Sequence, residues 1–130
     1  MFTNILKSTL ETAAAKALAT NGPEGINVVP VSMIRVNEND IWLFDFFMDK
    51  TAKNAEAGEK AALTAWTDMV GVQIIAELQY VTSGSDFEEA VTWVKTQNAS
   101  RVVKGLLILR PSKVYDISPG GAFSAEDLSF

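Results

Sequence analysis

Lys50 and Thr51 stand where an apolar strand is expected to end and a short helix to begin, a junction that suits an anion. The first helical turn has unpaired N–H groups and the positive end of the helix dipole, both of which attract negative charge. Lys50 adds a full charge, and the Thr51 hydroxyl and backbone N–H can donate to phosphate oxygens. The pattern fits a phosphate monoester held without a metal. The alternative is ordinary: Thr51 caps the helix, and Lys50 and Lys53 lie in water.

The composition restricts the rest of the chemistry. The 130 residues include no cysteine and no histidine. These absences exclude disulfides, thiol nucleophiles, a Ser-His-Asp triad and the usual zinc sites, so no metal site is expected. Redox chemistry in such a chain must reside in a bound organic cofactor. No residue is identified as catalytic, and the phosphate-loop pattern GxxxxGK(S/T) does not occur.

Charge and hydropathy restrict the partners. Sixteen acidic residues outnumber eleven basic ones, which leaves a net charge of −5. The basic residues are scattered, whereas nucleic-acid binding needs them clustered, so no nucleic-acid partner is expected. No apolar window approaches the ~20 residues that span a bilayer, and no signal peptide is recognised. A single domain over residues 1–130, located in the cytoplasm and not on a membrane, is therefore expected.

Turn signals at 21–25 and 37–40 help to divide the chain into short elements. The expected elements are a helix over 4–11, strands over 14–20, 26–36 and 41–46, a helix over 51–57 ended by Gly58, strands over 61–66 and 70–81, a helix over 85–97, and a final strand over 105–117 interrupted near Pro111. Pro30 places the strand 26–36 at a sheet edge or a bulge. That strand and the apolar run 41–46 are expected to pair as a hairpin.

The helix over 85–97 has the clearest local signals. Ser85 is expected to cap it, because Glu88 follows three residues later, as in a capping box. The apolar residues between Phe87 and Val94 recur at helical spacing and form one stripe. Many short antiparallel strands with two or three inserted helices indicate a mainly β, α+β domain, either a small barrel or a sandwich.

The order of four segments resembles the FMN-binding split-barrel proteins, the small relatives of pyridoxamine 5′-phosphate oxidase. The segments are NVVPVSMIRV, IWLFDFFMDKTAKNA, KAALTAW and GVQIIAEL, and the likeness runs over residues 18–120, ending on YDISPG. MDKTAKN, over 48–54, is similar to the phosphate-binding turn of small flavin-binding members. The resemblance implies a six-stranded antiparallel split β-barrel (Greek key) with short flanking helices. It also implies a homodimer with cofactor sites at the subunit interface.

The resemblance implies nine cofactor-binding residues. They are Pro30, Val31 and Ser32 along the isoalloxazine ring, Asp45, Phe46 and Phe47 along the ring and ribityl chain, Lys50 and Thr51 at the phosphate, and Gln73, which matches a strand glutamine that reaches the flavin. Each set has an ordinary alternative: an edge strand, core packing, a wet strand end or a contact between subunits. A buried carboxylate such as Asp45 is costly unless it is paired or hydrogen-bonded.

The expected function is that of an FMN-binding flavoprotein, an FMN-dependent oxidoreductase of unknown substrate. The alternatives are a carrier that binds FMN without turnover, a deazaflavin-binding relative and a purely structural dimer. Haem is disfavoured, because neither histidine nor cysteine is present to ligate iron. The chain departs from the oxidases, whose substrate site includes an arginine and a histidine near the C-terminus, since no arginine follows Arg110. Oxidation of vitamin B6 is therefore not expected.

Overall fold

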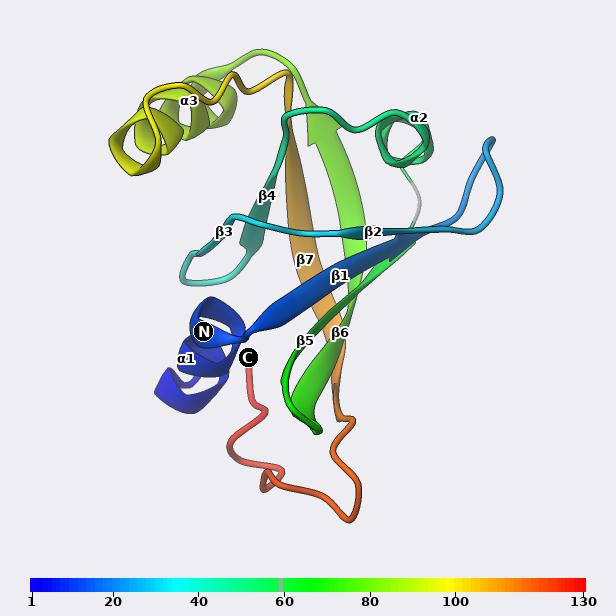
Figure 1. The fold of residues 1–130 in the computed structure, drawn as a ribbon, viewed down its shortest axis with the longest axis vertical. Helices are drawn as coiled ribbons and strands as arrows, with labels where there is room; N and C mark the ends of the chain where they lie inside the picture. Colours follow the sequence, from blue (N-terminus) through cyan, green and yellow to red (C-terminus); the bar gives the residue numbers. More distant parts are fainter. Residues whose placement is uncertain (59) are drawn as a thin grey trace.

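The computed structural model describes residues 1–58 and 60–130, which form one antiparallel sheet curled into a half-barrel, with three helices around it (Figure 1). The sheet order is β2-β1-β5-β6-β7-β4-β3. The elements are α1 (Asn4–Thr12), β1 (Ala15–Thr20), β2 (Asn27–Pro30), β3 (Ile34–Val36), β4 (Ile41–Asp45), α2 (Lys50–Glu56), β5 (Lys60–Thr67), β6 (Val70–Val81), α3 (Ser85–Gln97) and β7 (Gly105–Asp116). None of the described helices is both long and apolar enough to cross a membrane.

The sheet has seven strands over the described residues, not the six expected, because the run 26–36 divides into two. β2 pairs with β1, and β3 pairs with β4, so residues 31–33 cross from one edge of the sheet to the other. Pro30 ends the edge strand β2, where its missing N–H costs no ladder bond. The edge position of Pro30 is thus confirmed. The expected hairpin with 41–46 forms only over its β3 half, which the 37–40 turn joins to β4.

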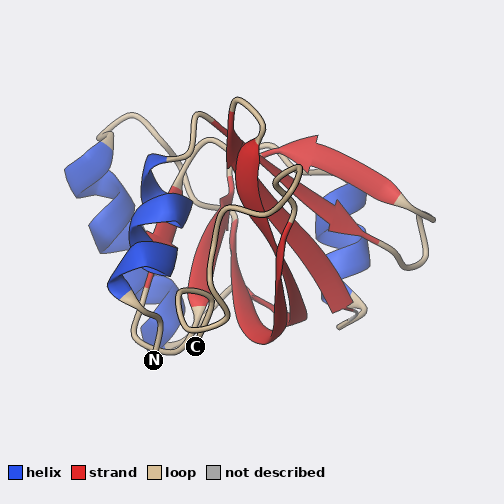
Figure 2. Cartoon of the chain, turned by 90° about the horizontal axis from the view of Figure 1, so that it is seen from below, coloured by secondary structure: helices blue, strands red, loops and turns tan. Residues whose placement is uncertain are grey.

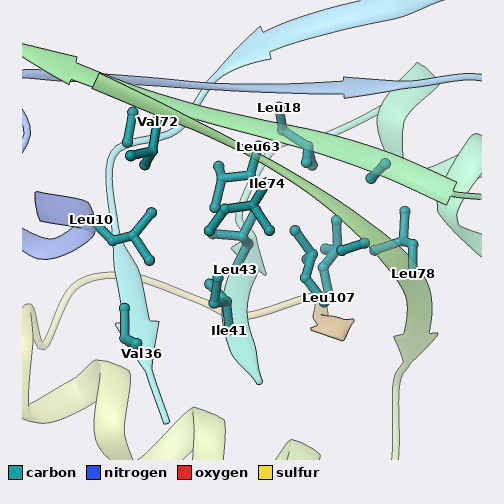
Figure 3. Packing of buried hydrophobic residues seen from close by; sticks show 14 of the residues in the cluster. Leu10, Leu18, Val36, Ile41, Leu43, Leu63, Val72, Ile74, Leu78 and Leu107 are labelled. Carbon is teal, nitrogen blue, oxygen red and sulfur yellow. The ribbon is translucent and has the colours of Figure 1, made fainter. Parts of the chain in front are cut away.

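Two hydrophobic clusters lie on opposite sides of β4 and β7. Ile41 and Leu43 of β4 face the first cluster, the barrel core, together with Leu107 and Leu109 of β7 (Figure 3). The intervening residues of both strands face the second cluster, the outer core, which also contains residues of α3. Figure 2 shows the helices lying on two sides of the curled sheet. All five residues of β4 are buried for this reason. A strand covered on both faces has a continuous apolar run in place of alternation, which is why 41–46 is recognisable in the sequence.

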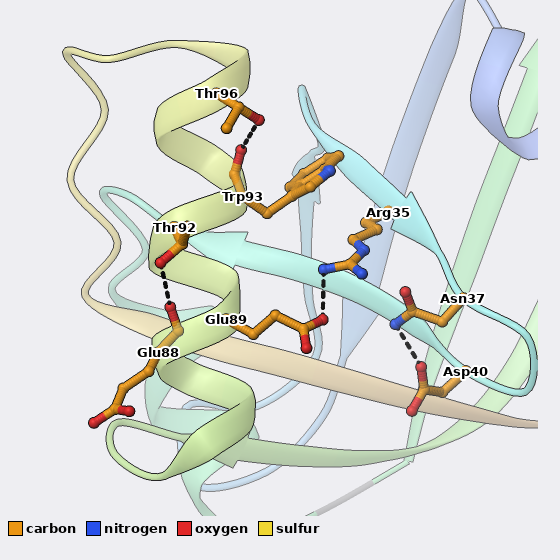
Figure 4. A network of polar contacts seen from close by, with 8 residues as sticks. All are labelled: Arg35, Asn37, Asp40, Glu88, Glu89, Thr92, Trp93 and Thr96. Carbon is orange, nitrogen blue, oxygen red and sulfur yellow. Dashed lines mark hydrogen bonds and ion pairs between the residues drawn. The ribbon is translucent and has the colours of Figure 1, made fainter.

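Arg35 of β3 ties α3 to the sheet (Figure 4). Its Nη1 atom lies 2.8 Å from the Glu89 carboxylate, and its guanidinium carbon lies 4.8 Å and 5.6 Å from the ring centres of Trp42 and Trp93. The stripe of α3 buries Ala90 and Val94 against the same outer core. A salt bridge that is half in water contributes little by itself, so the aromatic stacking and the apolar stripe supply most of the docking.

The other expected elements agree with the structure, with two corrections. β7 is continuous, and the expected interruption is a bulge: Ile75 pairs with Lys113 and Ala76 pairs with Pro111, which leaves one extra residue on β7. Ser85 does not cap α3, because it is the first residue of the helix and the capping position before it belongs to Gly84, which makes no side-chain cap bond. Gly58 follows α2 with a φ of 73°, as expected of a glycine that ends a helix.

The turn after β7 is organised by Asp116. Its carboxylate accepts backbone N–H groups from Ala122 (2.6 Å), Ser118 (2.9 Å) and Phe123 (3.0 Å). These bonds hold the pKa of the Asp116 carboxyl well below its usual range, since they stabilise the ionised form. The Ser118 hydroxyl in turn accepts the Gly71 N–H at 3.1 Å, which fastens the turn to the start of β6.

We predict that Asp116→Asn lowers stability at neutral pH and that this difference disappears in acid. A carboxyl whose pKa is depressed on folding stabilises the folded state above its unfolded pKa of about 3.9, and the effect is lost as the pH falls through the lower, folded pKa. Urea unfolding of both proteins at pH 7, 5 and 3 measures this. The difference in the free energy of unfolding between the two proteins should be equal at pH 7 and pH 5 and smaller at pH 3. An unchanged gap at pH 3 would contradict the assignment.

Candidate functional site

A cavity of about 220 Å³ lies where the segment that crosses between β2 and β3 passes the end of β4. One wall is the crossing segment and the other is the end of β4 with the turn that follows it, and a side chain from the connection between α3 and β7 completes the lining. The lining residues are Val29, Pro30, Val31, Ser32, Met33, Phe44, Phe46, Phe47, Met48 and Arg101. A cavity with apolar and aromatic walls and few polar groups is typical of a site for a small organic ligand.

Five of the nine sequence-predicted site residues line this cavity. Pro30, Val31 and Ser32 lie on the crossing segment, and Phe46 and Phe47 lie just beyond β4. The Val31 N–H donates to the Lys16 carbonyl at 2.9 Å, which fixes the start of the crossing segment against β1. Phe46 is buried, whereas Phe47 is 83% exposed, so Phe47 is a side chain that a ligand or a partner can still cover.

Asp45 does not line the cavity but determines the course of the chain beside it. The carboxylate is buried, with only 2% of the residue exposed, and both oxygens have donors. Oδ1 accepts the Met48 N–H at 2.8 Å, and Oδ2 accepts the Tyr80 hydroxyl at 2.6 Å. Burial and then the Asp45 carboxylate raise the pKa of Tyr80, which keeps the hydroxyl protonated as a donor. The expected need of Asp45 for a partner is therefore met inside the chain.

Gly105 makes room for this pair. It lies opposite Asp45 in the register of β4 and β7, and the Tyr80 ring packs directly over it. A Cβ at this position would collide with the ring and the hydroxyl of Tyr80. Sequence reasoning missed both Tyr80 and Gly105, because their roles depend on three strands brought together by the sheet.

Thr51 and Lys50 both lie at the start of α2, but the Thr51 side chain is buried and the Lys50 side chain is exposed. Thr51 is only 1% exposed, and its Oγ1 accepts the Asn27 side-chain amide at 2.7 Å, so it anchors α2 to β2. The helix cap is Asp49, which makes no side-chain cap bond, so the alternative that Thr51 caps the helix is wrong. Lys50 is exposed, and Lys53 lies 3.3 Å from the Asp49 carboxylate. Neither Lys50 nor Thr51 is among the residues that line the cavity.

Gln73 lies on β6, on the face of the sheet that is turned away from the barrel core. Its neighbours Val72 and Ile74 point into that core, and alternation along a strand sends Gln73 the opposite way. In the register it stands between Thr64 of β5 and Tyr115 of β7. It is half-buried and is not a lining residue of the cavity.

Arg101 is the charged lining residue among the five that sequence reasoning did not place in the site; the others are Val29, Met33, Phe44 and Met48. It comes from the connection between α3 and β7, and its guanidinium carbon lies 4.9 Å from the ring centre of Phe46. Lys104 of the same connection lies 5.9 Å from the ring of Phe47. A single arginine in a polar loop gives no sequence signal, because only the fold brings that loop to the end of β4.

Comparison with known proteins agrees with this architecture. A family model described as pyridoxamine 5′-phosphate oxidase matches residues 2–120. The chain belongs to the pyridoxamine 5′-phosphate oxidase family. Its fold is that of the split-barrel members, which confirms the predicted family and architecture. Comparison with curated proteins found no match.

Solved structures of low sequence identity share the fold. HupZ of Group A Streptococcus is 19% identical with a TM-score of 0.81, over 95% of this chain and 100% of HupZ. An FMN-binding protein from Syntrophomonas wolfei is 18% identical with a TM-score of 0.73, over 88% of this chain and 84% of its own. An F420 reductase is 12% identical with a TM-score of 0.63, over 84% of this chain and 94% of its own.

We predict that Tyr80→Phe lowers the free energy of unfolding by about 1–3 kcal/mol, because it leaves a buried Asp45 oxygen without its donor. The sequence holds two tyrosines, and Tyr115 is 45% exposed, so Tyr115→Phe is a matched control. That control should change stability by less than about 0.5 kcal/mol. Urea unfolding of the three proteins measures both effects, and equal losses in the two variants would refute the role given to Tyr80.

Proposed function

We propose that the protein binds a flavin, FMN, with its isoalloxazine ring in the cavity beside β4. The observation that carries this proposal is the meeting of Pro30, Val31, Ser32, Phe46 and Phe47 in one cavity of a split barrel. Largely apolar and aromatic walls fit a planar ring, and the backbone groups of the crossing segment can form hydrogen bonds with its polar edge. The FMN-binding structural relative from Syntrophomonas wolfei supports the same cofactor.

The flavin, when bound, supplies the electron chemistry of an FMN-dependent oxidoreductase. The chain supplies position and exclusion of water. Phe44 and Phe46 form a rigid aromatic wall, since their rings stack at 6.2 Å and Phe44 also stacks on Trp93 at 5.4 Å. Asp45 holds the turn that carries Phe46 and Met48.

Two alternatives share this site. A deazaflavin in place of FMN is favoured by the structural likeness to an F420 reductase, and both ligands present a flat tricyclic ring. A carrier of FMN without turnover would use the same walls. Anaerobic mixing with reduced nicotinamide cofactors separates carrier from reductase, because a carrier leaves its flavin oxidised.

The flavin proposal is tested by absorption spectroscopy and by paired ligands. Titration with FMN should perturb the visible flavin band, and a spectrum identical to that of free FMN at saturating protein would reject the proposal. If Lys50 holds the phosphate, Lys50→Ala weakens FMN about tenfold and leaves riboflavin, which lacks the phosphate, nearly unchanged. Lys95→Ala, on the exposed side of α3, is the control. Thr51 is unsuited to this test, because it is buried against Asn27.

We also propose a homodimer in which a second copy completes the cofactor site. Two rows of residues cross five strands, from β2 to β7, on the outer sheet face, which is the part of the face turned away from the barrel core that α3 does not cover. These residues are mostly small or apolar. The rows are Pro30–Ala17–Thr64–Gln73–Tyr115 and Val28–Ala19–Ala62–Ile75–Lys113. Pro30 belongs to this face and to the cavity. The cavity of about 220 Å³ is below the ~300 Å³ at which small-molecule sites begin. A second copy on this face would add a further wall beside Pro30 and so extend the site.

The dimer predicts a mass of two chains in sedimentation at micromolar concentration. Thr64→Arg places a charge at the middle of the outer face and should shift the mass to one chain, because an unpaired charge in an apolar interface is costly. Thr92→Arg on the exposed side of α3 adds the same charge elsewhere and should leave the mass unchanged. A single-chain mass for the unaltered protein would reject the dimer.

A further inference from the structure

Arg101 is the one charged residue among those that line the cavity. The other lining residues are neutral, and apart from Ser32 their side chains carry no hydrogen-bonding oxygen or nitrogen. In a chain of net charge −5, this is a local reversal of sign. A ligand that enters the cavity therefore meets a guanidinium and no lining carboxylate.

Arg101 differs from the two other arginines of the chain in having no polar side-chain partner among the described residues. The Arg35 guanidinium is paired with Glu89 at 2.8 Å, and Arg110 donates to the Gln79 side chain at 2.9 Å. The Arg101 guanidinium instead lies over the ring of Phe46. Such a contact uses no hydrogen-bond donor, so the guanidinium N–H groups remain available to donate to an anion.

The segment that carries Arg101 is held against the end of β4. The Lys104 N–H donates to the Asp45 carbonyl at 2.8 Å, and the Arg101 N–H donates to the Asn98 carbonyl at 3.2 Å. Lys104 adds a second positive charge on the same side, over Phe47. The position of Arg101 at the cavity is thus set by backbone bonds at both ends of a short segment and does not depend on a flexible loop.

We propose that Arg101 is the anion-binding side chain of this cavity: it pairs with a phosphate or carboxylate group of a molecule whose flat ring lies along Phe46. The guanidinium fork matches either group with two parallel hydrogen bonds. This inference rests on the proposed function only in taking flavin as that molecule or as its neighbour. The anionic group then belongs either to the FMN phosphate or to a second, substrate-like molecule beside the ring.

A measurement on the unaltered, flavin-free protein tests anion binding directly. The three arginine Nε–H groups give separate nitrogen–proton NMR signals, and benzoate and benzyl alcohol are probes of equal ring and different charge. Benzoate should shift the Arg101 signal saturably, benzyl alcohol should not, and the signals of Arg35 and Arg110 serve as internal controls. Equal shifts of all three signals, or of Arg101 with both probes, would overturn the proposal. This NMR titration tests anion binding by Arg101 even if the protein binds no flavin.

Variants then identify the source of the anion. If the source is FMN, Arg101→Gln weakens FMN about tenfold more than riboflavin, and Arg101→Lys recovers part of the loss. If the source is a second molecule, the two flavins bind Arg101→Gln as before, and benzoate no longer perturbs the flavin band of the loaded variant. Equal loss of FMN and riboflavin, with benzoate binding retained, would mean that Arg101 only packs on Phe46 and would overturn the proposal. Lys95→Gln, which removes a charge on the exposed side of α3, is the matched control.

Discussion

The buried carboxylate of Asp45 is the constraint on which the functional end of the barrel depends. A carboxylate that is 2% exposed must have every oxygen satisfied, and here each oxygen has its own donor from a different element. The Met48 N–H fixes the turn after β4, and the Tyr80 hydroxyl fixes β6 beside it. The same residue accepts the Lys104 N–H through its carbonyl, which brings in the segment before β7. One residue thus joins β6 to two segments that line the cavity, the turn after β4 and the connection before β7.

Much of the fold could be predicted from the sequence, because the local signals agree with the tertiary arrangement. The run 41–46 is apolar throughout since both of its faces are covered, and Pro30 indicates an edge since it lacks an N–H. The division of 26–36 into β2 and β3 could not be predicted, because β-branched residues favour a strand without saying which neighbour the strand pairs with. Ser85 failed as a cap because Gly84, with a φ of 99°, takes the capping position with no side chain to offer.

The candidate site also has parts that the sequence predicts and parts that it does not. The crossing segment and the phenylalanines after β4 are contiguous stretches with family likeness, and they were identified together. Thr51 is expected at an anion, and this stays a prediction for its backbone N–H. Its side chain turns inward to Asn27, because a single sequence does not reveal which side of a short helix is buried. Arg101 and Gly105 belong to the site only through contacts between segments that are distant in the sequence. Local patterns therefore predict much of the apolar lining of the cavity, whereas its one charged lining residue is placed there by the tertiary fold.

The alternation of β4 and β7 between the two cores has a consequence for how a ligand can enter. Leu43 and Leu107 belong to the barrel core, while Phe44 and Leu106, one residue away on the same strands, belong to the outer core. Because the two clusters share these strands, we expect the aromatic wall of the cavity to open only when the whole domain unfolds. Residues 31–33, by contrast, lie outside the strand ladders. A ligand that enters the proposed site would thus displace the crossing segment at a lower cost than the β4 wall.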